Sequence, residues 1–110
     1  MNTEPYQPCI EACDACAAAC DRCAFACLKE PDVANIARCI RLNVECASLC
    51  RFTSGALARE SHLALEFCAL CAQTCDECAD ECAQHPSEQC ETCSDACRRC
   101  AEACRATGSQ

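Results

Sequence analysis

The chain has 110 residues, the size of one small domain, and a formal net charge of −8. This negative charge argues against nucleic acid or an anionic membrane surface as a partner, and no apolar stretch approaches the ~20 residues that cross a bilayer. The start, MNTEPYQPC, has neither a basic segment nor an apolar one, so no export signal is predicted. We therefore expect a single domain over residues 1–110 in the cytoplasm, where thiols are kept reduced.

Helix-breaking residues divide the chain into four predicted helices. Pro8 marks the first helix start, Pro31 and Pro86 interrupt the chain, and Ser54-Gly55 is a turn signal between the second and third helices. The connections are only a few residues long, which favours antiparallel neighbours. The fold class that we expect is all-α, an antiparallel up-down-up-down four-helix bundle with a cysteine-lined core. The predicted helices span residues 8–29, 32–53, 56–85 and 87–106.

Nineteen residues are cysteine, and most of them are spaced three or four apart. This spacing places every sulfur of a run on one face of a helix, and it is also the spacing of the residues that face the core of a coiled coil. The sequence therefore predicts a bundle whose interior is lined with thiols. The three long runs are Cys9, Cys13, Cys16, Cys20, Cys23 and Cys27; Cys68, Cys71, Cys75, Cys78 and Cys82; and Cys90, Cys93, Cys97, Cys100 and Cys104.

The second predicted helix has a sparser run. It contains only Cys39, Cys46 and Cys50, with Leu42 or Asn43 at the skipped position. It also carries a second apolar face, which indicates either packing between neighbouring helices or a surface for self-association. That face comprises Val33, Ile36, Ile40, Val44 and Ala47, and the third helix adds Leu63, Phe67 and Leu70.

The last 40 residues contain no large apolar side chain. Between Cys71 and Gln110 there is no Leu, Ile, Val, Met, Phe, Tyr or Trp, so helices in this stretch can bury only Cys and Ala. Small side chains remove less area from water than leucines do. We therefore expect bound ions or an oligomer to add stability.

So many thiols have several conceivable uses. Filling the core would be served as well by Ala or Val, without a risk of oxidation. Disulfides within a run would strain the helix, because helical neighbours stand ~5–6 Å apart, and the number of cysteines is odd. Iron–sulfur ligands typically come from irregular backbone with gaps such as C-x2-C-x2-C. Soft metal ions are the best match, chiefly Cu(I), with Zn(II) also possible.

Charge favours the monovalent ion. A cuprous ion that displaces one thiol proton leaves the net charge unchanged, whereas Zn(II) held by four thiolates adds −2. Four such zinc sites would take the chain from −8 to −16 inside a small fold, and charge buried in a low-dielectric core is costly. About one Cu(I) per thiol avoids this cost.

The cysteine runs and the lack of an export signal resemble the cytosolic branch of the bacterial copper storage proteins. The likeness extends from Cys9 to Cys104 and rests on the density of C-x2-C and C-x3-C repeats. The exported branch has methionines near the bundle mouth, but the only methionine here is Met1. The resemblance implies a bundle that binds many cuprous ions, mostly between pairs of thiolates, and that assembles as a homotetramer. A copper chaperone is then a candidate partner.

Two histidines have different prospects as metal ligands. His85 lies three residues after Cys82 and continues its stripe, at the end of the bundle that should also hold Cys27, Cys39 and Cys90. A neutral imidazole there could receive an incoming cuprous ion, although a histidine at a helix C-terminus also interacts favourably with the helix dipole. His62 is one position off the stripe and is expected at the surface.

We therefore predict a copper storage protein whose metal ligands are the nineteen cysteines and His85. The alternatives are a thiol redox buffer, or sequestration of zinc or another soft metal. No HExxH, Ser-His-Asp or phosphate-loop motif is present, so an enzyme is not predicted.

Overall fold

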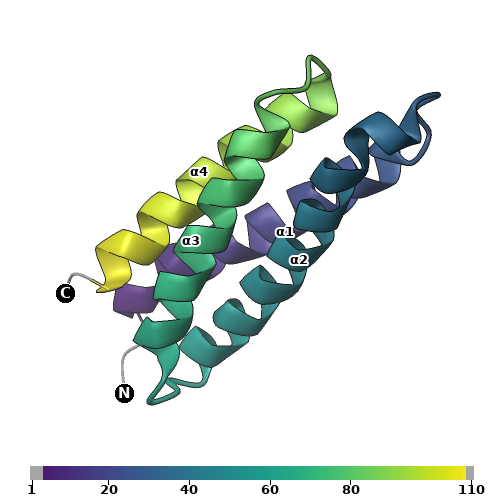
Figure 1. Cartoon of the computed structure of the whole chain (residues 1–110). Helices are drawn as coiled ribbons and strands as arrows, with labels where there is room; N and C mark the ends of the chain where they lie inside the picture. The colour runs from purple at the N-terminus through teal and green to yellow at the C-terminus, as the bar shows by residue number, and fades with distance from the viewer. Residues whose placement is uncertain (1–3, 109–110) are drawn as a thin grey trace.

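The computed structural model describes residues 4–108 and contains four antiparallel α-helices within that range (Figure 1). Each helix packs against two neighbours, so that α1 and α3 both contact α2 and α4. The chain runs up, down, up and down, which confirms the predicted fold class. The elements are a 3-10 turn over Glu4–Tyr6, α1 over Gln7–Cys27, α2 over Val33–Ala58, α3 over Ala64–Cys82 and α4 over Glu88–Gly108.

The bundle is an elongated rod of 50 × 18 × 18 Å. The start of α1, the end of α4 and the α2–α3 connection lie at one end, which we call the terminal end (Figure 1). The α1–α2 and α3–α4 connections lie at the other, which we call the His85 end. No helix within residues 4–108 is long and apolar enough to cross a membrane. The export-signal prediction includes residues 1–3, which lie outside the described part of the chain.

The boundary between the second and third helices differs from the prediction. Helix α2 continues through Ser54 and Gly55 to Ala58, because continued helix places Leu57 fully inside the terminal end. The chain reverses instead at Glu60, whose φ of 54° is left-handed. The backbone N–H of Ser61 donates to the carbonyl of Ala56 at 2.9 Å, which closes the helix in a Schellman arrangement. Helix α3 therefore begins at residue 64 rather than 56.

The third predicted helix also ends earlier than expected. Helix α3 stops at Cys82, and the backbone N–H of His85 donates to the carbonyl of Cys82 in a final turn before Pro86. His85 therefore lies in the α3–α4 connection rather than on the helix itself. Its side chain remains close to the last turn of α3 and only partly exposed.

Ion pairs on the rod's surface connect neighbouring helices. Arg98 on α4 contacts Asp80 on α3 at 3.3 Å. Arg105 on α4 pairs with Asp76, which lies one turn before Asp80 on α3. Exposed pairs of this kind each contribute roughly 0–1 kcal/mol. Register between the helices must therefore depend mostly on the core.

Candidate metal centre

The interior of the rod is built almost entirely from sulfur and methyl groups. All nineteen cysteines are at most 1% exposed, and all are free thiols. Buried alanines fill the gaps between the stripes, and Leu57, Ala64 and Tyr6 close the core at the terminal end. The 3–4 spacing thus places every sulfur where the sequence predicted it, on the inward face of its helix.

Sulfurs approach one another both along a helix and across helices. Neighbours one turn apart on the same helix, such as Cys16 and Cys20 or Cys23 and Cys27, have Sγ atoms 3.9–4.0 Å apart. Sulfurs on different helices come closer still. The shortest such contacts are Cys39–Cys82 at 3.5 Å, Cys9–Cys104 and Cys20–Cys93 at 3.6 Å, and Cys13–Cys100, Cys16–Cys97, Cys20–Cys97, Cys46–Cys75 and Cys50–Cys71 at 3.7 Å.

These contacts assemble into groups of four sulfurs that lie within 4.8 Å of one another. The groups overlap, because Cys16 and Cys46 belong to two of them, and Cys20 and Cys97 also belong to two. A thiol shared in this way would have to bridge two ions if both of its groups were filled. The fully buried groups include Cys13-Cys71-Cys100-Cys104, Cys16-Cys46-Cys50-Cys75, Cys16-Cys20-Cys46-Cys97, Cys20-Cys78-Cys93-Cys97 and Cys23-Cys27-Cys39-Cys90.

One amide lies among the thiols. Asn43 is fully buried and occupies the position that the sparse run on α2 skips, whereas Leu42 packs in the core beside it. Its side chain bonds only to cysteine sulfurs: Oδ1 accepts from Cys78 at 3.1 Å, from Cys93 at 3.2 Å and from Cys82 at 3.5 Å, and Nδ2 donates to Cys39 at 3.7 Å. The sequence left Leu42 and Asn43 as alternatives. The spacing of 4, 3 and 4 through residues 39, 43, 46 and 50 was the signal that selects Asn43.

Burial opposes ionisation of the thiols at the His85 end. Desolvation, with further repulsion from a neighbouring thiolate at Cys23, raises the pKa of Cys27 to about 12, and desolvation also raises the pKa of Cys90. Deeper in the core, hydrogen bonds from neighbouring thiols, chiefly Cys100, lower the pKa of Cys16. A first thiolate in a group is thus stabilised by S–H donors, while a second is opposed by like charge.

His85 is held by a carboxylate. Its Nε2 lies 2.9 Å from Glu81 Oε2, and the other oxygen of that carboxylate accepts from Arg38 Nε at 3.1 Å. The histidine also lines a cavity of about 310 Å³ at the His85 end, between Glu30, Asp32 and Asn35 on one side and Pro86 and Ser87 on the other. This pairing leaves Nδ1 of the ring available for a second partner. His62 is exposed, as predicted.

The sequence of this chain is similar to those of known cysteine-rich proteins. A sequence model of the family described as "Copper storage protein" matches residues 2–109. Among curated proteins, the uncharacterized cysteine-rich protein YhjQ of Bacillus subtilis (strain 168) is 42% identical over 66 residues, or 60% of this chain. That match spans 61% of YhjQ, less than two thirds of its length.

Solved structures match over nearly the whole chain. The Cu(I)-bound copper storage protein BsCsp3, from Bacillus subtilis, is 40% identical with a TM-score of 0.91, over 94% of this chain and 98% of that one. A cytosolic copper storage protein from Streptomyces lividans, with five coppers, is 39% identical with a TM-score of 0.94, over 98% and 95% of the two chains. Both of those proteins were solved with copper bound.

Proposed function

Since this chain belongs to the copper storage protein family, we propose that it stores Cu(I) by binding many ions between its nineteen core thiolates, with His85 as a further ligand at one end. The observation that supports this best is the series of buried four-sulfur groups along the rod, three of which share sulfurs. Cu(I) prefers soft thiolate ligands, and the helices already hold the sulfurs together, so little conformational freedom is lost for each ion bound.

The overlap of the groups also favours Cu(I) over Zn(II). Structural zinc usually takes four ligands in an isolated tetrahedron, whereas Cys16, Cys20, Cys46 and Cys97 are shared and would have to bridge two zinc ions if neighbouring groups were both filled. A cuprous ion can use two or three sulfurs, so adjacent ions can share one group. Charge balance agrees, because one Cu(I) for one lost proton leaves the core neutral.

Anaerobic titration with Cu(I) against a chromophoric chelator tests the proposal. We expect uptake of more than ten ions per chain, with little change in helical circular dichroism because the sulfurs are already in place. About one proton should be released into a weakly buffered solution for each ion bound.

The same titration separates the alternatives. Uptake of only a few Cu(I) ions, or tight Zn(II) binding at four thiols per ion, would contradict copper storage. A thiol redox buffer would instead form inter-helix disulfides reversibly, in two-electron steps and without metal. A family whose role is storage also supports the proposal that the chain has no catalytic turnover.

We further propose that copper enters at the His85 end. A ligating histidine commonly donates its second ring N–H to a carboxylate, which fixes the ring's orientation, and Glu81 with Arg38 provides such a partner. The acidic side chains of Glu30 and Asp32 on the neighbouring cavity would attract a cation.

Replacement of His85 by alanine tests this route. We expect His85→Ala to slow copper loading severalfold in stopped-flow measurements, while final capacity falls by at most about one ion because the cysteines remain. His62→Ala, which removes the exposed histidine at the other end of α3, is the matched control and should load at the normal rate. An unchanged loading rate in His85→Ala would assign that residue a purely structural role.

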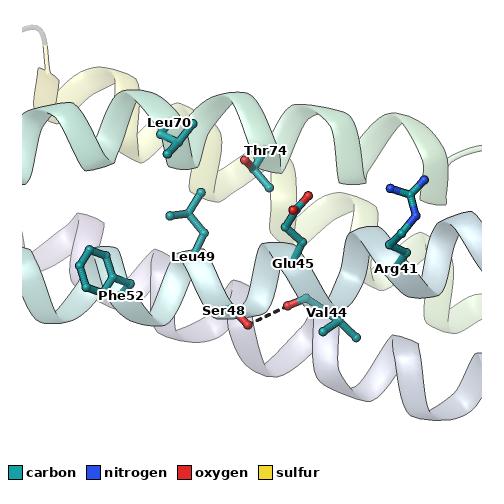
Figure 2. A pocket seen from close by; sticks show the side chains of 8 residues that line it. All are labelled: Arg41, Val44, Glu45, Ser48, Leu49, Phe52, Leu70 and Thr74. Atoms are coloured by element: carbon teal, nitrogen blue, oxygen red, sulfur yellow. Dashed lines mark hydrogen bonds between the residues drawn. The ribbon is translucent and has the colours of Figure 1, made fainter.

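We propose a homotetramer that forms through a face of α2 and α3. A groove lies between these helices, lined by Leu49 and Phe52 of α2 and by Leu70 and Thr74 of α3. Val44 also lines it, from the side of α2 that faces away from α3 (Figure 2). Val44, Phe52 and Leu70 are each about half exposed, and the Phe52 ring meets the Phe67 ring edge-on at 4.8 Å. Of the second apolar face predicted on α2, Ile36 and Ala47 are used inside the chain, whereas Val44 is not.

The cytosol is the compartment that we propose for this protein. Reduced thiols are required for copper uptake, and the cytosol keeps thiols reduced. The Streptomyces lividans relative is described as cytosolic. A copper chaperone that passes Cu(I) to the His85 end is the delivery partner consistent with that location.

A further inference from the structure

A cavity on the side of the rod is bordered by a thiol of the core. It lies between α1 and α4, has a volume of about 300 Å³ and is lined by Cys23. Cys23 is 1% exposed, and its Sγ lies 3.9 Å from that of Cys27 and 3.8 Å from that of Cys90. The cavity therefore adjoins one of the buried four-sulfur groups, that of Cys23, Cys27, Cys39 and Cys90. It shares no lining residue with the cavity beside His85.

The lining of this cavity carries one positive and one negative side chain. Arg22 comes from α1 and Glu88 from the first turn of α4, and both are exposed. Neither takes part in the ion pairs that connect side chains within residues 4–108. Gln89 and Thr92 add an amide and a hydroxyl to the same wall. The cavity is thus equipped for a ligand that has an anionic group for the guanidinium and a cationic group for the carboxylate.

Size and the neighbouring thiol define the ligand further. Ligand pockets measure roughly 300–1,000 Å³, so this cavity suits a small molecule and not a folded protein. A molecule that takes copper from Cys23 must offer a soft donor, because Cu(I) prefers sulfur. One small molecule that combines a thiol with a carboxylate for Arg22 and an ammonium for Glu88 is an amino-acid thiol, either cysteine itself or a short cysteine peptide.

We propose that the α1–α4 cavity binds an amino-acid thiol that removes Cu(I) from the Cys23 group. The inference rests on the proposed copper storage function and adds a place of release to it. The sulfur of the ligand bonds to the ion while the bond between the ion and Cys23 Sγ breaks, and the proton of the incoming thiol passes to the Cys23 thiolate. A second thiol molecule replaces the remaining protein sulfur in the same way. The ion leaves bound to two sulfurs, and no electron is transferred.

Anaerobic release of copper from the loaded protein to a chromophoric chelator, with L-cysteine as the probe, tests this inference. We expect the release rate to rise with the L-cysteine concentration and to saturate, because the thiol binds before it exchanges. Arg22→Gln should raise the half-saturating concentration about fivefold, since the carboxylate of the probe loses its partner. Copper capacity should not change, because Arg22 is exposed and is not a metal ligand.

Arg99→Gln is the matched control. Arg99 is an exposed arginine on α4 that does not line this cavity, so its replacement makes the same change in net charge at another place. We expect this variant to release copper to L-cysteine as the wild type does. An equal effect of the two substitutions would show that net charge, and not the cavity, governs release.

Thiols that lack one of the two charges separate the roles of Arg22 and Glu88. Cysteamine has the ammonium but no carboxylate, and 3-mercaptopropionate has the carboxylate but no ammonium. We expect Arg22→Gln to slow release by 3-mercaptopropionate but not by cysteamine, and Glu88→Gln to show the opposite pattern. Each thiol is compared between variant and wild type, so that differences in the reactivity of the thiols themselves cancel.

Release by L-cysteine at the same rate in the wild type, Arg22→Gln and Glu88→Gln would overturn the inference, because exchange would then proceed without this cavity. Failure of the wild type itself to bind more than a few cuprous ions would instead contradict the storage function, so the two results are distinguishable.

Discussion

The empty protein is expected to lose its helical structure as the pH rises from about 9 to about 12, whereas the copper-loaded protein stays folded. Burial raises the pKa of Cys27 from 9.0 to about 12, and it also raises the pKa of Cys90. Their protonated thiols therefore favour the fold fully below pH 9, where the unfolded chain is protonated too. That stability is lost as the unfolded chain ionises and the pH passes toward 12.

The size of this effect follows from the crowding of the thiols. Each unit of pKa shift corresponds to about 1.4 kcal/mol, and domains of this size are stable by roughly 5–15 kcal/mol in total. A few thiols that cannot ionise in place are enough to unfold the bundle. Thiolates bound to Cu(I) have already lost their protons, so the loaded protein has no comparable dependence on pH.

Anaerobic circular dichroism with parallel ultraviolet detection of thiolate measures both parts of this prediction. Helix loss and thiolate formation should coincide in the empty protein. The loaded protein should retain its helical signal to pH 12. Retention of full helicity by the empty protein while its thiols ionise near pH 9 would show that buried charge is tolerated in this core.

Replacement of Leu70 by glutamate is expected to convert the proposed tetramer into monomers. Leu70 is 51% exposed on the α2–α3 face, opposite Leu49 and Phe52. A carboxylate there would have to be desolvated in an apolar contact, close to Glu45 on the same groove. Because the substituted side chain does not reach the core, copper capacity per chain should not change.

Phe25→Glu is the control for this variant. Phe25 is 63% exposed on α1 and does not line the α2–α3 groove, and the Lys29 ammonium lies over its ring. Sedimentation of the three proteins at micromolar concentration should give tetramers for the wild type and Phe25→Glu, and monomers for Leu70→Glu. A tetrameric Leu70→Glu would place the interface on another face, and a monomeric wild type would exclude the assembly altogether.

The sequence predicted the bundle and the thiol core because both depend on a simple rule of spacing. A side chain that recurs every three or four residues faces one side of a helix, whatever the rest of the chain does. A different rule, which treats Ser54-Gly55 as a turn signal, failed at the end of α2. The burial of Leu57 outweighed that local signal, and the left-handed residue is Glu60, which no composition rule would have selected.

The sequence alone could not predict which side chains contact one another. Spacing shows that Cys16 and Cys46 both point inward, but only packing brings their sulfurs to 3.9 Å and gives them shared neighbours. His85 and Glu81 lie four residues apart, but only the structure shows that their side chains are in contact, at 2.9 Å. The hydrogen bonds of Asn43 also depend on cysteines of α3 and α4, which a single stripe cannot reveal.

The sharing of sulfurs between adjacent groups has a consequence for a partly filled protein. Because one thiol can serve either of two groups, a given number of ions can be arranged in many ways, and this multiplicity favours intermediate loads through configurational entropy. Between groups that share a sulfur, an ion can pass by exchanging one ligand at a time. Withdrawal of copper at one end would then be replenished from the interior, so the protein behaves as a reservoir with a common pool and not as a row of separate compartments.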